Sequence, residues 1–286
     1  MLPSMKTVRP SRLLAAALLL PILASAQVPQ EFWGRGRGWR REPLRVGLPE
    51  RGGVVDRGFT FCHLLYTSVR RESGGYGWST DYPEADRNFV IRLSQLTTAA
   101  VSRWDDGEPG FTVVRATDDE LYQCPFLFTS DVGTMGLSEL EALRLRDYLL
   151  KGGFLWVDDF WGTAAWEAWA SQLARVLPPR EYPIHDLPLD HPVFRTLFDV
   201  QEVPQIPSIQ FWRGSGSGTS ERGRDSATPH LRGVSDHLGN LMVLMTHNTD
   251  IADAWEREGE DQHYFYSFSP AGYALGINVL LYAMTH

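Results

Sequence analysis

The sequence predicts one α/β domain with a mostly parallel β-sheet. A strand, a capped helix and a second strand follow one another between Pro125 and Val157, which is the order of a right-handed parallel crossover. In a second segment, apolar residues recur every three or four positions, as on one face of a helix. Roughly 260 residues follow a predicted N-terminal signal, which is enough for one such domain with a sizeable core.

Residues 1–26 have the order of a cleaved signal peptide. Three basic residues precede an apolar run from Leu13 to Leu23, and the small residues 24–26 precede Gln27. The apolar run has 11 residues, whereas a bilayer crossing takes about 20, so an uncleaved anchor is the weaker interpretation. The predicted cleavage point has no cysteine to carry a lipid. We therefore expect a periplasmic or secreted protein.

The composition of residues 27–58 and the overall charge narrow the choice of partners. The segment is rich in Gly and Arg with little periodicity, so we expect a poorly ordered leader whose arginines are solvated rather than bound to an acidic surface. The formal net charge is −8, and signal cleavage makes it more negative by three. This charge disfavours nucleic acid and anionic lipid as partners.

The domain is predicted to span 59–286 and to contain five strands and four helices. Ser138 and Glu141 form a capping box at the start of the second helix, and Leu140, Leu143, Tyr148 and Leu149 supply its predicted buried stripe. The predicted strands are Phe59–Tyr66, Phe111–Val114, Pro125–Ser130, Phe154–Val157 and Leu241–Met245. The predicted helices are Ala85–Val101, the segment that follows Ser138, Ala164–Leu177 and Ala271–Met284.

The remaining segments are predicted to be irregular. Residues 180–209 are rich in proline, and residues 213–228 are a Gly- and Ser-rich stretch of low complexity. The C-terminal apolar helix is too short to span a membrane, and its two glycines favour close packing on the sheet. We expect no membrane span after signal cleavage.

Acidic residues follow the predicted strands at the carboxyl edge of the sheet, where open parallel sheets bind ligands. Asp131 follows one strand, Asp158 and Asp159 follow the next, and Asp250 follows the last. These four residues are the candidate ligand-binding set. Neighbouring carboxylates can bind a metal or divide acid and base roles, although Asp158 or Asp159 could equally cap the next helix.

Histidines suggest a second candidate, a metal site formed by His191, His247, Asp250 and Asp253. Imidazole together with carboxylates suits zinc or another divalent ion. The spacing matches no metal motif, so structural turns at both histidines remain the alternative. A divalent metal is the only cofactor that the residues suggest.

Catalytic nucleophiles are scarce. No glycine-flanked serine or cysteine forms a nucleophile elbow, and Ser130 has no evident base beside it. Cys62 and Cys124 form either a disulfide or two buried thiols. Trp161, Trp166 and Trp169 cluster near the expected crevice, where they either pack in the core or stack on sugar rings.

Four ordered motifs resemble a known family. The sequence is similar to the bacterial family called domain of unknown function number 4159 over roughly 59–286. This resemblance implies a three-layer sandwich similar to flavodoxin and to class I glutamine amidotransferases, but the amidotransferase cysteine has no counterpart here. The motifs are Lys151–Asp159, Leu189–Phe194, Asn248–Glu256 and Leu275–Val279.

Three functions remain open. The first is a non-catalytic domain that holds a small molecule or a protein partner of the cell envelope at the carboxyl edge of its sheet. The second is a metal-assisted hydrolase that acts on a cell-envelope polymer or carbohydrate through a metal-bound water. A purely structural part of an assembly would be favoured if the chain's own side chains filled the edge.

Overall fold

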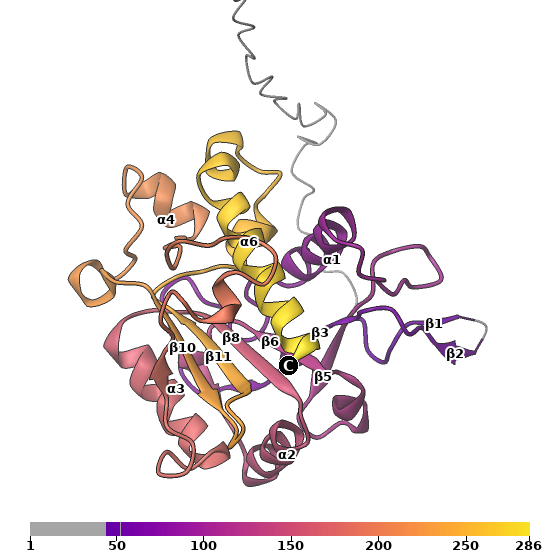
Figure 1. Cartoon of the computed structure of the whole chain (residues 1–286). Helices are drawn as coiled ribbons and strands as arrows, with labels where there is room; N and C mark the ends of the chain where they lie inside the picture. Colours follow the sequence, from indigo (N-terminus) through magenta and orange to yellow (C-terminus); the bar gives the residue numbers. More distant parts are fainter. Residues whose placement is uncertain (1–43, 52) are drawn as a thin grey trace, which may run out of the picture.

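Five neighbouring parallel strands make up most of a seven-stranded sheet (Figure 1). The computed structural model describes residues 44–51 and 53–286. The strand order is β5-β3-β6-β8-β11-β10-β9, and β10 and β9 are antiparallel to their neighbours. The strands of this sheet are β3 (Phe61–Leu65), β5 (Phe111–Arg115), β6 (Phe126–Thr129), β8 (Phe154–Phe160), β9 (His185–Asp186), β10 (His230–Ser235) and β11 (Leu241–His247).

Two small sheets and the helices complete the fold. Strands β1 (Glu50–Arg51) and β2 (Val54–Val55) form one pair, and β4 (Thr67–Ser68) and β7 (Met135–Gly136) form the other. The α-helices are α1 (Glu84–Leu96), α2 (Glu139–Leu150), α3 (Gly162–Val176), α4 (Ile209–Gly214), α5 (Asp253–Glu256) and α6 (Gln262–Thr285). The 3₁₀ helices are η2 (Asp119–Gln123), η3 (Val132–Thr134), η4 (Pro192–Phe194) and η5 (Gly223–Ser226).

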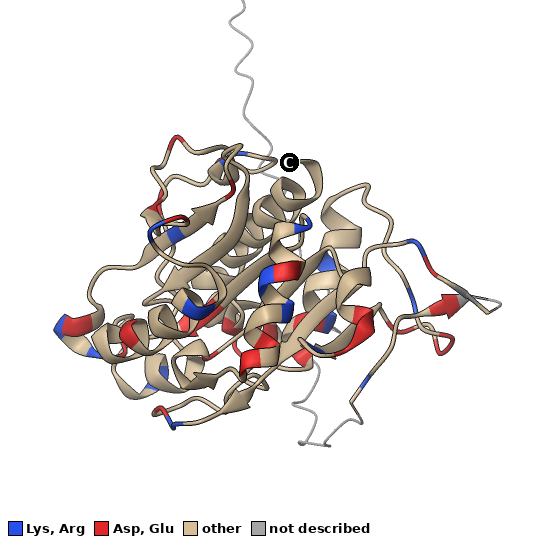
Figure 2. Ribbon diagram, turned by 90° about the horizontal axis from the view of Figure 1, so that it is seen from below, with Lys and Arg blue, Asp and Glu red and all other residues tan. Residues whose placement is uncertain are grey.

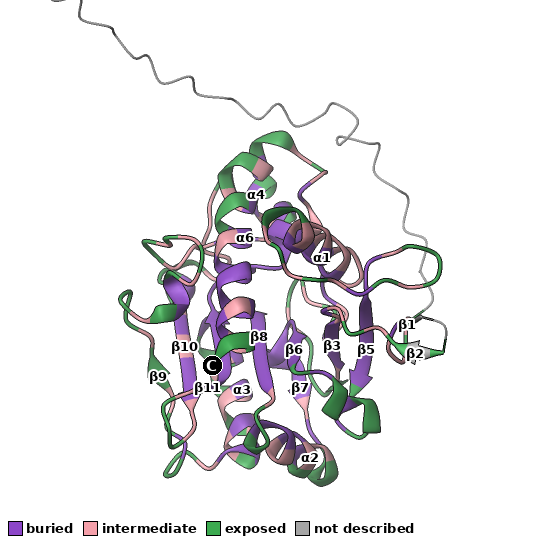
Figure 3. Ribbon diagram, turned by 45° about the vertical axis from the view of Figure 1, so that its right-hand side comes forward, coloured by how far each residue is buried: buried purple, intermediate pink, exposed green. Residues whose placement is uncertain are grey.

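Helices cover both faces of the main sheet, so that its strands are buried (Figure 3). On one face, Phe89 of α1, Ile277 of α6 and Trp156 of β8 belong to the same apolar cluster. On the other face, Leu145 of α2 and Trp169 of α3 join the second apolar cluster. The prediction of an α/β protein with a mostly parallel sheet is confirmed, including the crossover in which α2 connects the neighbouring parallel strands β6 and β8.

Several boundaries differ from the prediction. Strand β8 continues beyond Val157 to Phe160, so Asp158 and Asp159 lie within the strand rather than after it. Helix α1 ends at Leu96 instead of Val101. Helix α6 already begins at Gln262, where Asp261 caps its first turn, and it continues through Pro270. A sequence stretch with a proline and polar residues therefore became part of the longest helix that the structure describes.

Helix α2 has the predicted cap but a different buried face. The Ser138 side chain accepts the Glu141 backbone N–H and the Glu141 side chain accepts the Ser138 N–H, as in a capping box. Tyr148 and Leu149 are buried as expected, whereas Leu140 and Leu143 are exposed. The prediction was wrong for those two leucines because the helix turns Ala142 and Leu145 toward the sheet instead.

The end of the predicted leader has structure. The backbone N–H of Val113 donates to the Arg45 carbonyl, so the segment before β1 pairs with the edge strand β5. The hairpin β1–β2 follows it. The signal peptide predicted over 1–26 and the leader over 27–43 lie outside the described residues.

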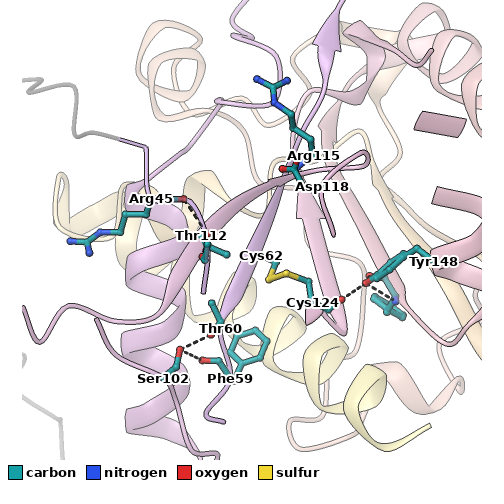
Figure 4. Close-up of a disulfide and its surroundings, with 12 residues drawn as sticks. Arg45, Phe59, Thr60, Cys62, Ser102, Thr112, Arg115, Asp118, Cys124 and Tyr148 are labelled. Atoms are coloured by element: carbon teal, nitrogen blue, oxygen red, sulfur yellow. Dashed lines mark hydrogen bonds between the residues drawn. A yellow bond between two sulfur atoms is a disulfide. The ribbon is translucent and has the colours of Figure 1, made fainter. Parts of the chain in front are cut away.

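A disulfide joins Cys62 of β3 to Cys124, just before β6 (Figure 4). The two Cα atoms are 6.0 Å apart. The Tyr148 hydroxyl donates to the Cys124 carbonyl, which holds the same turn against α2. Of the two alternatives that the sequence leaves open, the structure contains the disulfide.

In the part of the chain that the structure describes, no helix combines the length and the apolar character needed to cross a membrane.

Candidate functional site

Acidic residues lie at the carboxyl ends of four neighbouring strands. Asp81 lies in the connection after β3, Asp131 follows β6, Asp159 lies near the end of β8, and Asp250 follows β11. All four line one cavity of about 220 Å³. Asp81, Asp131 and Asp159 have positive φ angles of 67°, 51° and 52°, a left-handed conformation that aspartate tolerates better than most side chains. The chain thus turns sharply at the points where these side chains enter the cavity.

We call this cavity the carboxylate pocket. Its walls come from the carboxyl edge of the sheet, the loop before α1, α5, and the loops at 72–76 and 221–222. Figure 2 shows acidic segments of separate elements gathered near the middle of the molecule. The pocket is lined by the acids Glu72, Asp81, Asp131, Asp159, Glu221, Asp250, Asp253 and Glu256 and by the bases Arg222 and Arg257.

Asp81 is held by the start of α1 and by β6. Its backbone carbonyl accepts the Ala85 N–H in the first turn of the helix, and its side chain accepts the Ser130 hydroxyl at 3.1 Å. One turn into the helix, the buried Asp86 carboxylate lies 3.1 Å from Nδ1 of the buried His63 on β3. Helix α1 is therefore fastened to the sheet at the end that presents Asp81.

Two groups of three carboxylates share Asp81. One consists of Asp81, Asp253 and Glu256, and the other of Asp81, Asp159 and Asp250. Within each group, three carboxylate oxygens lie within 4.8 Å of one another. We refer to them as the two carboxylate triads. Oxygen atoms this close repel one another when ionised, unless protons or cations lie between them.

Burial is the main cause of the raised pKa values of the acids in the pocket. It raises the pKa values of Asp81, Asp159 and Asp250 well above the ordinary value for aspartate, and neighbouring carboxylates raise them further. Each of these three residues is at most 9% exposed. The pocket therefore retains protons at a pH at which exposed aspartates have lost them.

The pKa values of three other acids of the pocket are also raised. Burial raises the pKa of Asp131 to about 7, although the Gly77 backbone N–H that binds its carboxylate works against the shift. Burial raises the pKa of Glu256 to about 7 and that of Asp253 to about 6, with Arg257 lowering both. Several acids of the pocket thus change charge near neutral pH.

The two arginines of the pocket are already engaged with the protein. Arg222 lies 3.3 Å from the Glu221 carboxylate and donates to the Ser73 carbonyl at 2.8 Å. Arg257 lies 2.9 Å from Glu256 and 3.1 Å from Glu260. Two guanidinium groups do not balance eight carboxylates, so the pocket has an excess of negative charge when its acids ionise.

Asp158 differs from the other predicted acids because it points into the protein. It is fully buried, its carboxylate accepts the Thr246 hydroxyl, and it also accepts the Ala252 backbone N–H at 2.9 Å. It does not line the pocket, and it does not cap α3. Asp159 lines the pocket but does not cap α3 either, and its carboxylate accepts the Trp161 indole N–H at 2.8 Å. Alternation along β8 separates these two neighbours.

The structure does not assemble the histidine–carboxylate metal site. His247 packs on Phe160 and Trp166, and its ring nitrogens contact the Gly162 carbonyl and Arg232. Of the four predicted ligands, Asp250 and Asp253 line the pocket and His247 does not.

His191, the other predicted histidine ligand, lies elsewhere in the fold. It caps η4, where its Nδ1 accepts the Val193 N–H, and its ring packs against Tyr282 of α6. His191 therefore lies in a turn and does not line the carboxylate pocket.

The tryptophans divide between the pocket and the core. Trp161 lines the carboxylate pocket, Trp169 is buried in the core, and Trp166 is partly buried beside His247, where the Arg232 guanidinium lies 4.1 Å from its ring centre. The three do not form one exposed stacking surface.

Sequence reasoning missed half of the pocket. Asp81 and Glu256 were not predicted, although Asp81 lies between a strand and its following helix, and Glu256 lies one helical turn after Asp253. Asp131 comes almost directly after its strand, whereas a long loop separates Asp81 from β3, so the rule that selected Asp131 does not select Asp81. Glu72, Glu221 and Arg222 come from glycine-rich loops, and the sequence contains no signal that these loops fold over the sheet edge.

A larger cavity of about 300 Å³ lies at the opposite edge of the sheet. It is bounded by the turn between α2 and β8, the β10–β11 hairpin and the end of α6. Its walls include Tyr182, His237 and Leu241. Acidic triads such as those at the carboxyl edge do not occur there among the described residues, so we place the candidate site in the carboxylate pocket.

The fold and the pocket together define an α/β domain with an acidic cavity at the carboxyl edge of a mostly parallel sheet. Residues 61–284 match the family model described as a domain of unknown function, DUF4159. The chain belongs to this family. None of the curated proteins matches the chain.

Proposed function

We propose that this protein is a ligand-binding domain and that the carboxylate pocket binds a cation. The observation that carries the proposal is the pair of triads sharing Asp81, which gather five largely buried carboxylates around one cavity. Buried carboxylates are costly unless they are protonated, paired or bound to a cation. A cationic ligand would remove that cost and gain charge-assisted hydrogen bonds.

The thermal stability of the protein tests this proposal. Ligands that bind only the folded state raise Tm, so divalent metal chlorides and organic ammonium salts should stabilise the protein, while matched sodium salts and neutral sugars should not. The variant Asp81→Asn removes a carboxylate from both triads and should lose most of the Tm increase. The control Asp119→Asn changes a side chain that is 96% exposed, and this variant should keep the Tm increase. If none of these cations raised the Tm of the protein, the proposal would be contradicted.

A metal-assisted hydrolase is the second candidate, and the sharing of Asp81 favours it. A carboxylate common to two ligand groups suits two-metal sites, where a bound water attacks the substrate. Oxygen-only ligands suit Mg²⁺, Ca²⁺ or Mn²⁺ rather than zinc. The substrate would be a cell-envelope polymer or carbohydrate. Protein purified without chelator should contain stoichiometric metal and hydrolyse such a polymer, and loss of both in Asp81→Asn would assign the activity to the pocket.

Export and the finer fold class are also part of the proposal. The sequence of residues 1–26 supports a cleaved signal and a periplasmic or secreted location, and a disulfide is typical of oxidising compartments. Mass spectrometry of the protein recovered from the expressing cells should find a chain that begins near Gln27. The five parallel strands, numbered along the chain, are ordered 2-1-3-4-5, which supports a flavodoxin-like sheet similar to that of class I glutamine amidotransferases.

The partner would then be a small molecule or a protein of the cell envelope. The position of the pocket at the carboxyl edge agrees with where doubly wound sheets bind ligands.

A further inference from the structure

The carboxylate pocket is larger and less uniformly polar than a cage for a bare metal ion. Its volume is about 220 Å³, whereas oxygen ligands surround Ca²⁺ or Mg²⁺ at only about 2.0–2.6 Å. Three aromatic side chains, Tyr76, Tyr82 and Trp161, line it together with the acids. Tyr76 is 78% exposed at the mouth, and Trp161 is buried in the wall. The cavity therefore has room and apolar surface for an organic ligand.

Two deeply buried side chains have unused hydrogen-bonding capacity in this cavity. Asp250 is 2% exposed, and among the described residues only the Asp253 N–H donates to its carboxylate, at Oδ1. Asp159 is 9% exposed, and the Trp161 indole binds only its Oδ1. Among the described residues, the Oδ2 atoms of Asp159 and Asp250 accept no hydrogen bond. Both side chains line the cavity, so these oxygens are free to accept donors from a ligand.

The donor pattern of an ammonium group matches a carboxylate triad. An alkylammonium ion has three N–H donors and no acceptor, and each triad brings three carboxylate oxygens within 4.8 Å of one another. The guanidinium groups of Arg222 and Arg257 already bind protein carboxylates, so the pocket offers no unpaired base to an anionic group of a ligand. This pattern favours a ligand that is cationic at more than one point.

Building on the proposed cation site, we propose that the pocket binds a short aliphatic diamine. One ammonium group binds Asp81, Asp253 and Glu256, and the other binds Asp81, Asp159 and Asp250. Because the triads share Asp81, the two nitrogen atoms lie close together, which requires a short methylene chain between them. The chain packs against Trp161 and Tyr76, whose rings also attract the ammonium groups by cation–π interaction.

Isothermal titration calorimetry of the purified protein near neutral pH tests this proposal with defined probes. Putrescine, a four-carbon diamine, should bind about tenfold or more tightly than butylamine, which has the same carbon chain and only one ammonium group. Lengthening the diamine to eight carbons should weaken binding, because the two triads are too close for both ends. Magnesium and calcium chlorides serve as the metal probes.

Variants locate the binding site. Asp250→Asn keeps the shape of the side chain and should weaken putrescine binding about tenfold, with a smaller effect on butylamine, which can use the other triad. Asp119→Asn is the matched control and should leave binding unchanged. Circular dichroism melts identify any variant that fails to fold. In that case Tyr76→Ala, at an exposed position, tests the same pocket. This substitution should weaken diamine binding because it removes an aromatic contact with the methylene chain.

The outcomes separate this inference from the proposed function. Binding of magnesium or calcium without binding of putrescine would overturn the diamine proposal and leave the cation site standing. Equal affinities for putrescine and butylamine would also overturn it, as would putrescine binding that Asp250→Asn does not change. Failure of every cation to bind would overturn both.

Discussion

Replacing Asp131 by asparagine should make the protein less sensitive to alkaline pH. Asp131 is 2% exposed, and its carboxylate accepts the Gly77 N–H at 2.7 Å. Asparagine has the same shape, can accept that hydrogen bond, and tolerates the left-handed backbone at this position, where φ is 51°. The substitution therefore removes the charge with little other change.

The pKa of Asp131 determines the size and the sign of the effect. Burial raises it from 3.8 to about 7 in the folded protein. A raised pKa stabilises the folded state at low pH, and this stabilisation is lost as the pH rises through the folded-state value. One pKa unit corresponds to about 1.36 kcal/mol, so between about pH 5 and pH 8 this residue should cost the wild type about 2 to 3 kcal/mol of unfolding free energy.

Urea denaturation at both pH values measures this difference. The gap in unfolding free energy between Asp131→Asn and the wild type should widen by about 2 to 3 kcal/mol from pH 5 to pH 8, whatever constant effect the substitution has. Asp147→Asn is a useful control. Lys151 and Tyr122 lower the pKa of Asp147, so it is ionised in both states over this range and its gap should not change with pH.

Parallel pH profiles for Asp131→Asn and the wild type would refute the reasoning. They would mean that the folded protein does not hold a proton on Asp131 near neutral pH, and that the carboxylate is solvated in the pocket. A gap that narrows as the pH rises would mean that neighbouring cationic groups outweigh burial.

Other predictions follow from single contacts. Replacing Cys62 and Cys124 by alanine opens a loop of 62 residues and should lower the unfolding free energy by about 4 kcal/mol, as seen in denaturant titrations under oxidising conditions. Ser138→Ala removes the helix cap and should cost about 1 kcal/mol in the same assay, and an unchanged midpoint would contradict the capping role. Gly75→Val places a side chain against the Asp131 carboxylate, so calorimetry should show weaker cation binding by a protein whose far-ultraviolet spectrum is unchanged.

Part of the site followed from the strand pattern alone. Asp131, Asp159 and Asp250 were predicted because acids at the carboxyl ends of neighbouring parallel strands must share an edge. Asp158 does not line the pocket, because β8 continues past it and its side chain points inward, where it accepts the Thr246 hydroxyl. His247 does not line the pocket either, because its ring packs on Trp166 of α3 and contacts the Gly162 carbonyl.

The sequence by itself determined the parallel sheet, the crossover through α2 and its cap at Ser138, because these depend on local periodicity and short-range hydrogen bonds. Only the tertiary structure decided that Asp81 and Glu256 meet the predicted acids and that Cys62 meets Cys124. Such contacts join residues far apart in the chain. They depend on how loops close over the sheet, for which one sequence contains no periodic signal.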